Sequence, residues 1–481
     1  MHYEPIIGLE VHVQLKTNSK IFCSCSTTFG ASPNSQVCPV CLGMPGVLPV
    51  LNERVVDFAT RLALATKSKI NNFSLFARKN YFYPDLPKGY QISQFEEPFC
   101  EHGQLDISVD GVQKTIGITR IHLEEDAGKS VHAESFVREN ETLIDINRCG
   151  TPLLEIVSEP DFRSAREAHA YLVKLYQIVV YLGICDGNMA EGSLRCDANV
   201  SVRPVKETRF GTKTELKNMN SFHAVEKAID YEIRRQEMLL ESGGIVEQQT
   251  LLWDADHNVA APMRSKEYSH DYRYFPDPDL VPTTITSEFI DTIAKNLPEL
   301  PEAKRERFKS DFHLTEYDAA VLTETPDVAA YFEAVAALVE DKVSAGHWIM
   351  GHVMRALKER DESINTVLAP AHLAEILRLV EKGAINANSA RIIFDECRKT
   401  GQNPSLILQE KGLLQITDAS AIESFVDKVI AENPKDVQDY LDGNAKVLGF
   451  LMGQVMRATS GKANPQTVMS LLRSKLVKLN S

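Results

Sequence analysis

The stretch Ile7-Gly8-Leu9-Glu10-Val11-His12-Val13-Gln14-Leu15 alternates apolar and polar residues. Successive side chains of a β-strand point to opposite faces, so Glu10, His12 and Gln14 share one face while the other face is apolar. The pattern predicts a strand that packs one face on a hydrophobic core. A half-solvated antiparallel sheet gives the same alternation without any functional site, so this strand alone decides nothing about function.

Residues 194–203 repeat the alternation, with Arg195 and Asp197 on the polar side. The segment 145–156 places Glu155 inside an otherwise apolar run. A carboxylate in such a strand is costly to bury unless it is paired or coordinates a cation. These two segments therefore favour a polar site on the sheet over a merely solvated face.

A further apolar run, residues 116–126, ends in three consecutive acids, Glu124, Glu125 and Asp126. If these strands share one sheet, we expect the following residues to converge on a concave face: Glu10, His12, Glu125, Glu155 and Asp197. Several carboxylates with one imidazole suit Mg²⁺ that holds nucleotide phosphates. Strand alternation does not decide between Glu124 and Glu125, so both remain candidate ligands.

A nucleotide at this site needs cationic side chains, because the chain has no glycine-rich phosphate loop. Gly128-Lys129-Ser130 looks like the end of a P-loop, but the first glycine of that motif would fall at Leu123. A dinucleotide-type glycine motif is also absent from the sequence. The candidate phosphate contacts are Lys79, Lys88, Arg120, Arg148 and Arg195.

Four cysteines are clustered as Cys23-Ser24-Cys25 and Cys38-Pro39-Val40-Cys41. Two closely spaced thiolate pairs provide the four soft ligands of a tetrahedral Zn²⁺. A redox role for Cys38 and Cys41 leaves Cys23 and Cys25 unexplained. We therefore expect a structural zinc that pins a loop, since a four-thiolate site has no open position for substrate.

The composition is that of a globular protein, with 481 residues, 43% hydrophobic and 25% charged. A net charge of −14 argues against a protein that coats nucleic acid unspecifically, because such binding depends on phosphate neutralisation. The N-terminus lacks a signal peptide pattern, and no apolar run approaches the roughly 20 residues of a membrane span. We expect a soluble cytoplasmic protein with reduced thiols.

The order of patterns predicts an α+β cradle with a largely antiparallel sheet over residues 1–293. Prolines 276, 278 and 282 mark its exit, and helical patterns follow from about Leu297. We predict an all-α middle domain over 294–408 and a small helical tail over 409–481. Within the cradle, Ser164 and Glu167 form a capping box for a helix that ends at Gly183.

Five motifs in order resemble those of the B-subunit family of aspartyl/glutamyl-tRNA amidotransferases, and the resemblance runs essentially end to end. They are Ile7–Val13, Lys79–Asp85, Leu123–Lys129, Asp145–Ile156 and His270–Pro276. The resemblance implies a heterotrimer with an amidase-family A subunit, which releases ammonia from glutamine, and a small C subunit. It also implies a cradle similar to the glutamine synthetase catalytic fold.

In that family the B subunit uses Mg·ATP to phosphorylate the side-chain carboxylate of Glu on tRNA(Gln) or Asp on tRNA(Asn), and ammonia then displaces the phosphate. By position, the resemblance makes Glu10, His12, Glu125 and Glu155 the metal-binding catalytic residues, with Glu124 as a rival for Glu125. The supporting nucleotide contacts are Lys79, Lys88, Arg148, Arg195 and Asp197. Some members of the family lack the four cysteines, so the shared reaction does not need zinc. In this chain, which has all four, the resemblance implies a zinc ion that takes no part in the chemistry.

Residues 440–481 contain six basic residues against the single acid Asp442, a net charge of +5. The basic residues are Lys446, Arg457, Lys462, Arg473, Lys475 and Lys478. The resemblance implies that this tail contacts tRNA, although a cationic helix end on a solvated surface has the same composition. The alternative function is a non-catalytic, zinc-containing tRNA-binding scaffold. A free-standing glutamine hydrolase is excluded, because no nucleophile signature occurs in the sequence.

Overall fold

The computed structural model describes residues 2–131, 137–138, 141–263, 271–360, 364–415, 419–459 and 461–479. His270 of the fifth motif lies outside these residues. The chain divides into two units, Met1–Pro301 and Glu302–Ser481. The domain seams expected after residues 293 and 408 stay predictions.

A nine-stranded sheet organises the first unit, and neighbouring strands are antiparallel except for the parallel pair β12 and β13. The predicted α+β class with a largely antiparallel sheet is confirmed. Across the sheet the strands are β14 (Val259–Pro262), β13 (Thr250–Asp254), β12 (Thr214–Lys217), β11 (Leu194–Pro204), β1 (Tyr3–Gln14), β10 (Pro152–Ser158), β7 (Val112–Glu125), β6 (Cys100–Val109) and β2 (Lys69–Ile70).

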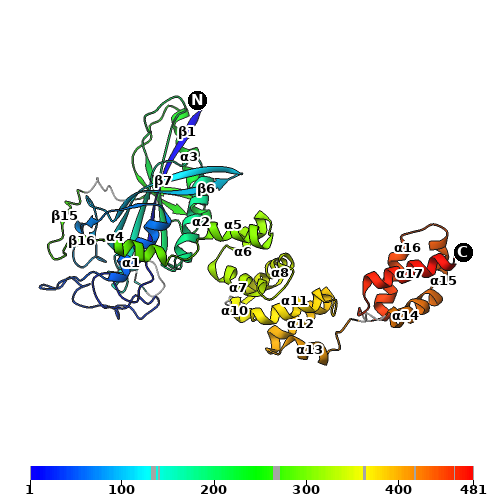
Figure 1. The fold of residues 1–481 in the computed structure, drawn as a ribbon. Helices are drawn as coiled ribbons and strands as arrows, with labels where there is room; N and C mark the ends of the chain where they lie inside the picture. The colour runs from blue at the N-terminus through cyan, green and yellow to red at the C-terminus, as the bar shows by residue number, and fades with distance from the viewer. Residues whose placement is uncertain are drawn as a thin grey trace. The chain divides into compact units, whose positions relative to one another are not determined.

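The apolar face of the central strand β1 forms part of the main core, where Ile7, Leu9, Val11 and Val13 are buried. Three helices contribute side chains to this core: α1 (Glu53–Ala65), α2 (Ala165–Tyr181) and α3 (Phe222–Glu241). α2 contacts β6 and α3 contacts β11 (Figure 1). Helices therefore cover the apolar side, and the polar side of the central strands is left for a site.

The ends of α2 follow the sequence signals. The Ser164 side chain accepts a hydrogen bond from the Glu167 N–H, and the Glu167 carboxylate accepts one from the Arg163 N–H. After the helix, Gly183 has a φ of +67°, and the Ile184 N–H donates to the Val179 carbonyl. A left-handed glycine of this kind satisfies the last carbonyls of a helix.

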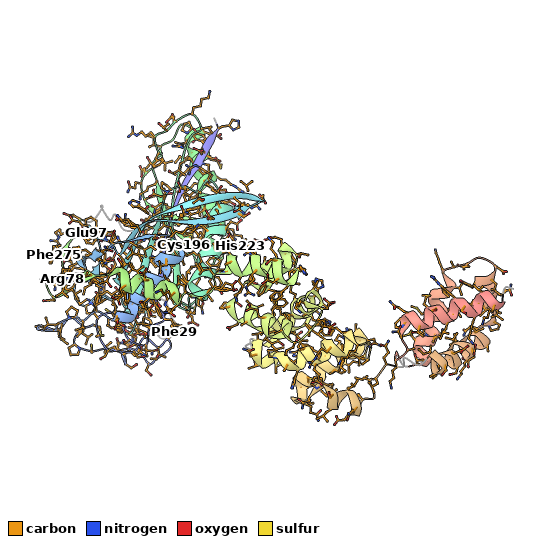
Figure 2. The ribbon with its side chains drawn as sticks, viewed as in Figure 1. Phe29, Arg78, Glu97, Cys196, His223 and Phe275 are labelled. Carbon is orange, nitrogen blue, oxygen red and sulfur yellow. The ribbon has the colours of Figure 1, made fainter. Side chains whose placement is uncertain are left out.

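A small sheet, β15-β4-β5, joins distant parts of the first unit through β15 (Phe275–Pro276), β4 (Ala77–Asn80) and β5 (Tyr90–Ser93). Arg78 Nε donates to Asp277 Oδ2 at 2.8 Å, and its Nη2 donates to Asp279 Oδ2 at 2.8 Å. The Arg78 guanidinium also lies 5.9 Å from the Phe275 ring (Figure 2). The other short pieces are β16 (Thr283–Thr284) with β3 (Phe73–Ser74), β8 (Lys129–Val131) with β9 (Leu143–Asp145), and α4 (Ser287–Lys295).

The second unit is helical, as predicted, and its described residues contain no strand. One core is built by α5 (Pro301–Phe312), α6 (Glu316–Leu322), α7 (Pro326–Ala336), α8 (Lys342–Trp348), the π-helix η1 (Ile349–Val353), α9 (Met354–Arg360), α10 (Ile364–Val367), α11 (Pro370–Glu381), α12 (Ala387–Thr400) and α13 (Pro404–Glu410). A separate core is built by α14 (Ala419–Glu432), α15 (Pro434–Leu441), α16 (Val447–Ala458) and α17 (Pro465–Leu479). Among all described residues, no helix combines the length and apolarity that crossing a bilayer requires.

Candidate active site

The register of the central strands gathers polar side chains on one face of the sheet. His12 of β1 pairs with Arg195 of β11 and with Glu155 of β10, and Glu155 pairs in turn with His122 of β7. Directly paired residues point to the same side of a sheet. These four side chains therefore form one row across four strands.

The neighbouring rows complete a group that we call the carboxylate cluster: Glu10, His12, Glu124, Glu155 and Asp197. Ligand atoms of Glu10, His12 and Asp197 lie within 4.8 Å of one another, and so do those of His12, Glu124 and Glu155. The shared member is His12, whose Nε2 lies 3.5 Å from Glu10 Oε1 and 3.8 Å from Glu124 Oε1. Four of the five sequence-predicted converging residues meet here.

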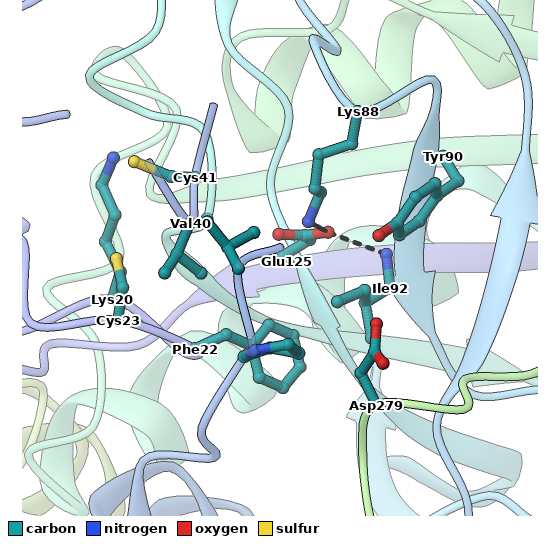
Figure 3. A pocket seen from close by; sticks show the side chains of 13 residues that line it. Lys20, Phe22, Cys23, Val40, Cys41, Lys88, Tyr90, Ile92, Glu125 and Asp279 are labelled. Atoms are coloured by element: carbon teal, nitrogen blue, oxygen red, sulfur yellow. Dashed lines mark hydrogen bonds and ion pairs between the residues drawn. The ribbon is translucent and has the colours of Figure 1, made fainter. Parts of the chain in front are cut away.

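The fifth, Glu125, does not join the cluster, which corrects the expected convergence. Consecutive side chains of β7 alternate, so Glu124 points to the polar face and Glu125 to the opposite one. There Glu125 forms an ion pair with Lys88 and accepts a hydrogen bond from the Ile92 N–H at 2.8 Å (Figure 3). Glu124 instead accepts a hydrogen bond from Ser93 Oγ at 3.0 Å and takes the place beside His12.

Burial and mutual repulsion raise the pKa values of the carboxyl groups in the cluster. Burial, together with Glu155 and Asp197, raises the pKa of Glu10 to about 7. Burial and the neighbouring Glu124 raise the pKa of Glu155 to about 8. Burial also raises the pKa of Glu124, whose side chain is only 3% exposed. Buried carboxylates that repel one another in this way are stabilised by a divalent cation bound between them.

The imidazole of His12 is also suited to bind a divalent cation at this site. Burial, reinforced by the charge of Arg195, lowers the pKa of His12 to about 3, so the ring is neutral at physiological pH. A neutral imidazole offers a lone pair to a metal, whereas a protonated one does not. The carboxylates of Glu10, Glu124 and Glu155, together with the neutral nitrogen of His12, form a donor set that fits Mg²⁺ or a similar hard cation.

Two lysines border the cluster. Although burial acts to lower it, the charges of Glu124 and Glu155 raise the pKa of Lys79, which is therefore a cation facing these carboxylates. Lys217 of β12 lies 2.9 Å from Asp197 and 3.2 Å from Glu215. Sequence reasoning proposed Lys79 but missed Lys217, because its strand of four residues gives too short an alternating pattern.

Three side chains on this face have buried nitrogen atoms without a hydrogen-bond partner: Arg120 Nε, His122 Nε2 and Arg195 Nε. His122 is 4% exposed, and its Nδ1 lies 4.0 Å from Glu155 Oε1. Its place two residues before Glu124 was a signal that could have identified it in the sequence. Unpaired buried polar atoms are rare in native proteins, and three of the eight found in the described residues lie on this face.

Arg195 and Arg148 are held at the cluster's edge by Asp126. Arg195 Nη2 donates to Asp126 Oδ2 at 2.8 Å, and Arg148 Nε lies 3.6 Å from the same oxygen. Burial opposes ionisation of Asp126, but Arg195 and Arg148 outweigh it and lower the pKa of this carboxyl. Arg148 also donates to the Gly128 carbonyl at 2.6 Å, so much of its donor capacity is used within the protein.

Lys88 lies apart from the cluster, on the opposite side of the sheet. It lines a small pocket with Glu125, Cys23, Cys41 and Lys20 (Figure 3). The Lys88 side chain is 6% exposed and engaged with Glu125. The structure therefore does not bring Lys88 to the other candidate phosphate contacts.

The four clustered cysteines converge as their spacing predicts. The Sγ atoms of the four residues all lie within 4.8 Å of one another: Cys23, Cys25, Cys38 and Cys41. The Cys38 N–H donates to Cys41 Sγ at 3.1 Å, an arrangement that stabilises a thiolate. The donor set of four sulfurs fits a tetrahedral Zn²⁺.

The basic residues proposed for the tail differ in their availability. Lys446, Arg457 and Arg473 are exposed, and Lys462 is half-buried. Lys475 lies 2.7 Å from Glu423 and 2.6 Å from Asp427, so it joins α17 to α14. The structure thus leaves Lys475 less able than the others to contact an external phosphate.

Comparison of the chain with known proteins identifies its family. Residues 5–291 match the family described as GatB/GatE catalytic domain, and residues 330–476 match the one described as GatB domain. The B subunit of the aspartyl/glutamyl-tRNA(Asn/Gln) amidotransferase of Geobacter sulfurreducens is 58% identical over 477 residues, which cover 99% of this chain and 100% of the relative. The protein of the same name from Carboxydothermus hydrogenoformans is 53% identical over 478 residues, 99% of each chain. The chain belongs to the family of aspartyl/glutamyl-tRNA(Asn/Gln) amidotransferase B subunits.

Proposed function

We propose that this chain is the subunit of a tRNA-dependent amidotransferase that activates the side-chain carboxylate of Glu on tRNA(Gln), Asp on tRNA(Asn), or both. Activation uses Mg·ATP, and the products are Gln-tRNA(Gln) and Asn-tRNA(Asn). The family membership supports the overall reaction. The observation that carries the site assignment is the convergence of Glu10, Glu124 and Glu155 around the neutral His12.

Glu10, His12, Glu124 and Glu155 hold Mg²⁺ in this proposal, and the fifth member of the cluster, Asp197 of β11, supports them. When bound, the metal supplies positive charge that offsets the negative charge of the phosphates during transfer. Lys79 and Arg195 provide further cationic groups at the cluster for the nucleotide or the substrate carboxylate. The partnerless nitrogens of Arg120 and His122 are available on the same face.

The chemistry explains why a kinase-like site is needed. A carboxylate oxygen of the substrate attacks the γ-phosphorus of ATP, the bond to the β-phosphate oxygen breaks, and ADP leaves. Ammonia then attacks the carbonyl carbon, the carbon–oxygen bond to phosphate breaks, and the nitrogen loses a proton. A free carboxylate does not react in this way, because its leaving group would be oxide.

The ammonia in this proposal comes from an amidase-family A subunit, and a small C subunit completes the heterotrimer.

The basic tail contributes tRNA contacts through Lys446, Arg457, Lys462 and Arg473, with Lys475 in a structural role. RNA recognition through shape and backbone needs no base-reading motif.

The free thiols are consistent with a cytoplasmic protein.

A structural Zn²⁺ is part of the proposal. The four sulfurs of Cys23, Cys25, Cys38 and Cys41 fit its coordination, and a complete set of protein ligands leaves no position for substrate. The zinc therefore fixes the loop between β1 and α1 rather than taking part in the reaction.

The test compares Glu124→Gln and Glu155→Gln in the assembled complex. We expect both to lower transfer of the γ-phosphate to mischarged tRNA by at least about 100-fold, because the loss of one metal ligand disturbs charge stabilisation. Glutamine hydrolysis, which belongs to the partner, should remain. Undiminished phosphate transfer in both variants would refute the site, and absence of Mg·ATP binding by the unmodified complex would favour the non-catalytic scaffold.

A further inference from the structure

Two tyrosine-rich segments contribute no ligand to the carboxylate cluster, yet they lie together. Residues 79–85 begin in β4, and residues 271–276 end in β15, which pairs with β4. The Asn80 N–H donates to the Tyr272 carbonyl at 3.0 Å, and Asn80 Nδ2 donates to the Arg273 carbonyl at 2.8 Å. Asn80 and Tyr272 are 192 residues apart in the chain, so two distant segments form one local surface.

The tyrosine rings of this surface form a continuous line with Phe95, which follows β5, and we call this line the aromatic strip: Phe95, Tyr274, Tyr272, Tyr81 and Tyr83. Phe95 and Tyr274 are stacked, with centroids 4.3 Å apart and planes 6° from parallel. The following centroid distances are 6.1 Å from Tyr274 to Tyr272, 6.0 Å from Tyr272 to Tyr81, and 5.9 Å from Tyr81 to Tyr83.

Both ends of the strip are open to solvent. Phe95 is 53% exposed and Tyr83 is 48% exposed, and none of the five rings belongs to the hydrophobic core of the first unit. Large aromatic side chains that stack on one another at the surface, rather than packing into the core, are typical of interaction sites.

The inner part of the strip reaches the carboxylate cluster through Lys79. Its Nζ lies 4.9 Å from the Tyr272 ring centroid and 5.9 Å from that of Tyr81. The same ammonium interacts with Glu124 and Glu155. The middle of the strip therefore adjoins the place where we expect the substrate carboxylate to be activated, and the strip continues from there to an exposed ring at either end.

We propose that the aromatic strip binds the unpaired 3′ nucleotides of the substrate tRNA by base stacking and so brings the aminoacyl end to the carboxylate cluster. This inference rests on the proposed function. The amino acid is esterified to the terminal ribose, so the last bases must pass close to the site of activation. Unpaired RNA bases bind aromatic side chains by stacking, and nearby cations contact the phosphates between them.

The number of rings favours RNA over the adenine of ATP. A single base covers about one or two rings, whereas the strip has five rings, each next to the following one. Lys79 beside Tyr272, and the exposed Arg273 between Tyr272 and Tyr274 in the chain, supply positive charge for a backbone that continues beyond one base. An ATP adenine on the strip is the competing outcome of the test.

The test measures equilibrium binding of uncharged tRNA to the complete complex, in the absence of ATP and glutamine. We expect Phe95→Ala to weaken binding by about tenfold, the contribution of one stacked base, and Phe95→Trp to restore it. The matched control is Phe210→Ala, which removes a 57% exposed ring outside the strip and should leave binding unchanged. Tyr83→Ala tests the other end of the strip.

A second arm uses tRNA that lacks its unpaired 3′ nucleotides. This truncation should weaken binding to the unmodified complex, and Phe95→Ala should add no further loss. An equal loss with truncated tRNA, unchanged binding in both strip variants, or a raised equilibrium Kd for ATP with unchanged tRNA binding would overturn the inference. Because no catalysis is measured, these results are independent of whether Glu124→Gln abolishes phosphate transfer, so the two proposals fail separately.

Discussion

Glu124 and Glu125 are neighbours in the chain but point to opposite faces of β7. Glu124 lies beside His12, with 3.8 Å between its Oε1 and the imidazole Nε2, whereas Glu125 forms an ion pair with Lys88 on the far side. The pleat of the strand thus gives two identical side chains different surroundings. One is positioned to bind a metal, and the other neutralises a buried lysine.

The first prediction separates these two roles. Glu125→Gln should lower the free energy of unfolding by about 3–5 kcal/mol, because it leaves the Lys88 charge buried without its partner. Glu124→Gln should instead be neutral or stabilising without metal, since it removes a buried, repelled carboxylate. Thermal unfolding of both variants and Mg²⁺ titration measure the effects. Mg²⁺ affinity should fall only for Glu124→Gln, and the reverse pattern would contradict the assignment.

The second prediction concerns pH. Folding raises the pKa of Glu10 to about 7 and that of Glu155 to about 8, from 4.5 for an unperturbed glutamate. Below about pH 6.5 the lowered pKa values of His12 and His122 act in the opposite direction. Above it the folded chain binds more protons than the unfolded chain, so its free energy of unfolding should fall as the pH rises from about 6.5 to about 8. Thermal unfolding without divalent cations measures this slope. Glu155→Gln should reduce it.

The same ionisation affects metal binding, which forms the third prediction. Mg²⁺ competes with the protons on Glu10 and Glu155, so its apparent affinity should rise by about tenfold or more between pH 6 and pH 8. Calorimetric titrations at the two pH values, with correction for proton release, test this. A pH-independent affinity would mean that the metal binds elsewhere.

The fourth prediction concerns the cysteines. The purified chain should contain one zinc ion, and removing it with a chelator or by Cys38→Ser should lower Tm by roughly 5 °C through loss of a loop constraint. Metal analysis and thermal unfolding provide the measurements. Cys397→Ser, which changes a buried thiol outside the cluster, is the control and should keep the zinc.

The fifth prediction concerns the tail. Lys446→Ala and Arg457→Ala remove exposed charges at the two ends of α16. Each should weaken tRNA binding and lower by about one the number of counterions released, measured as the slope of log K against log salt concentration. Lys475→Ala should have a smaller effect on binding, because this lysine is paired with Glu423 and Asp427. An equal loss for all three variants would show that the ion pairs open on binding.

The clear alternation of residues 7–15 and 194–203 was enough to predict two central strands and their polar faces. The capping signals at Ser164 and Gly183 likewise predicted α2. In contrast, three consecutive acids at 124–126 contain no alternation, so the sequence did not separate Glu124 from Glu125. Lys217 was missed because its strand of four residues gives too short an alternating pattern, and His122 was missed although it lies two residues before Glu124.

The sequence by itself determined the fold class, the family resemblance and the grouping of four cysteines, because these depend on local periodicity and spacing. Only the tertiary structure decided which carboxylates meet, since that depends on strand register across residues far apart in the chain. It also showed that Lys88 and Lys475 are engaged in ion pairs, which their identity as cations does not reveal. Pairing between distant strands, rather than local pattern, determines the candidate active site.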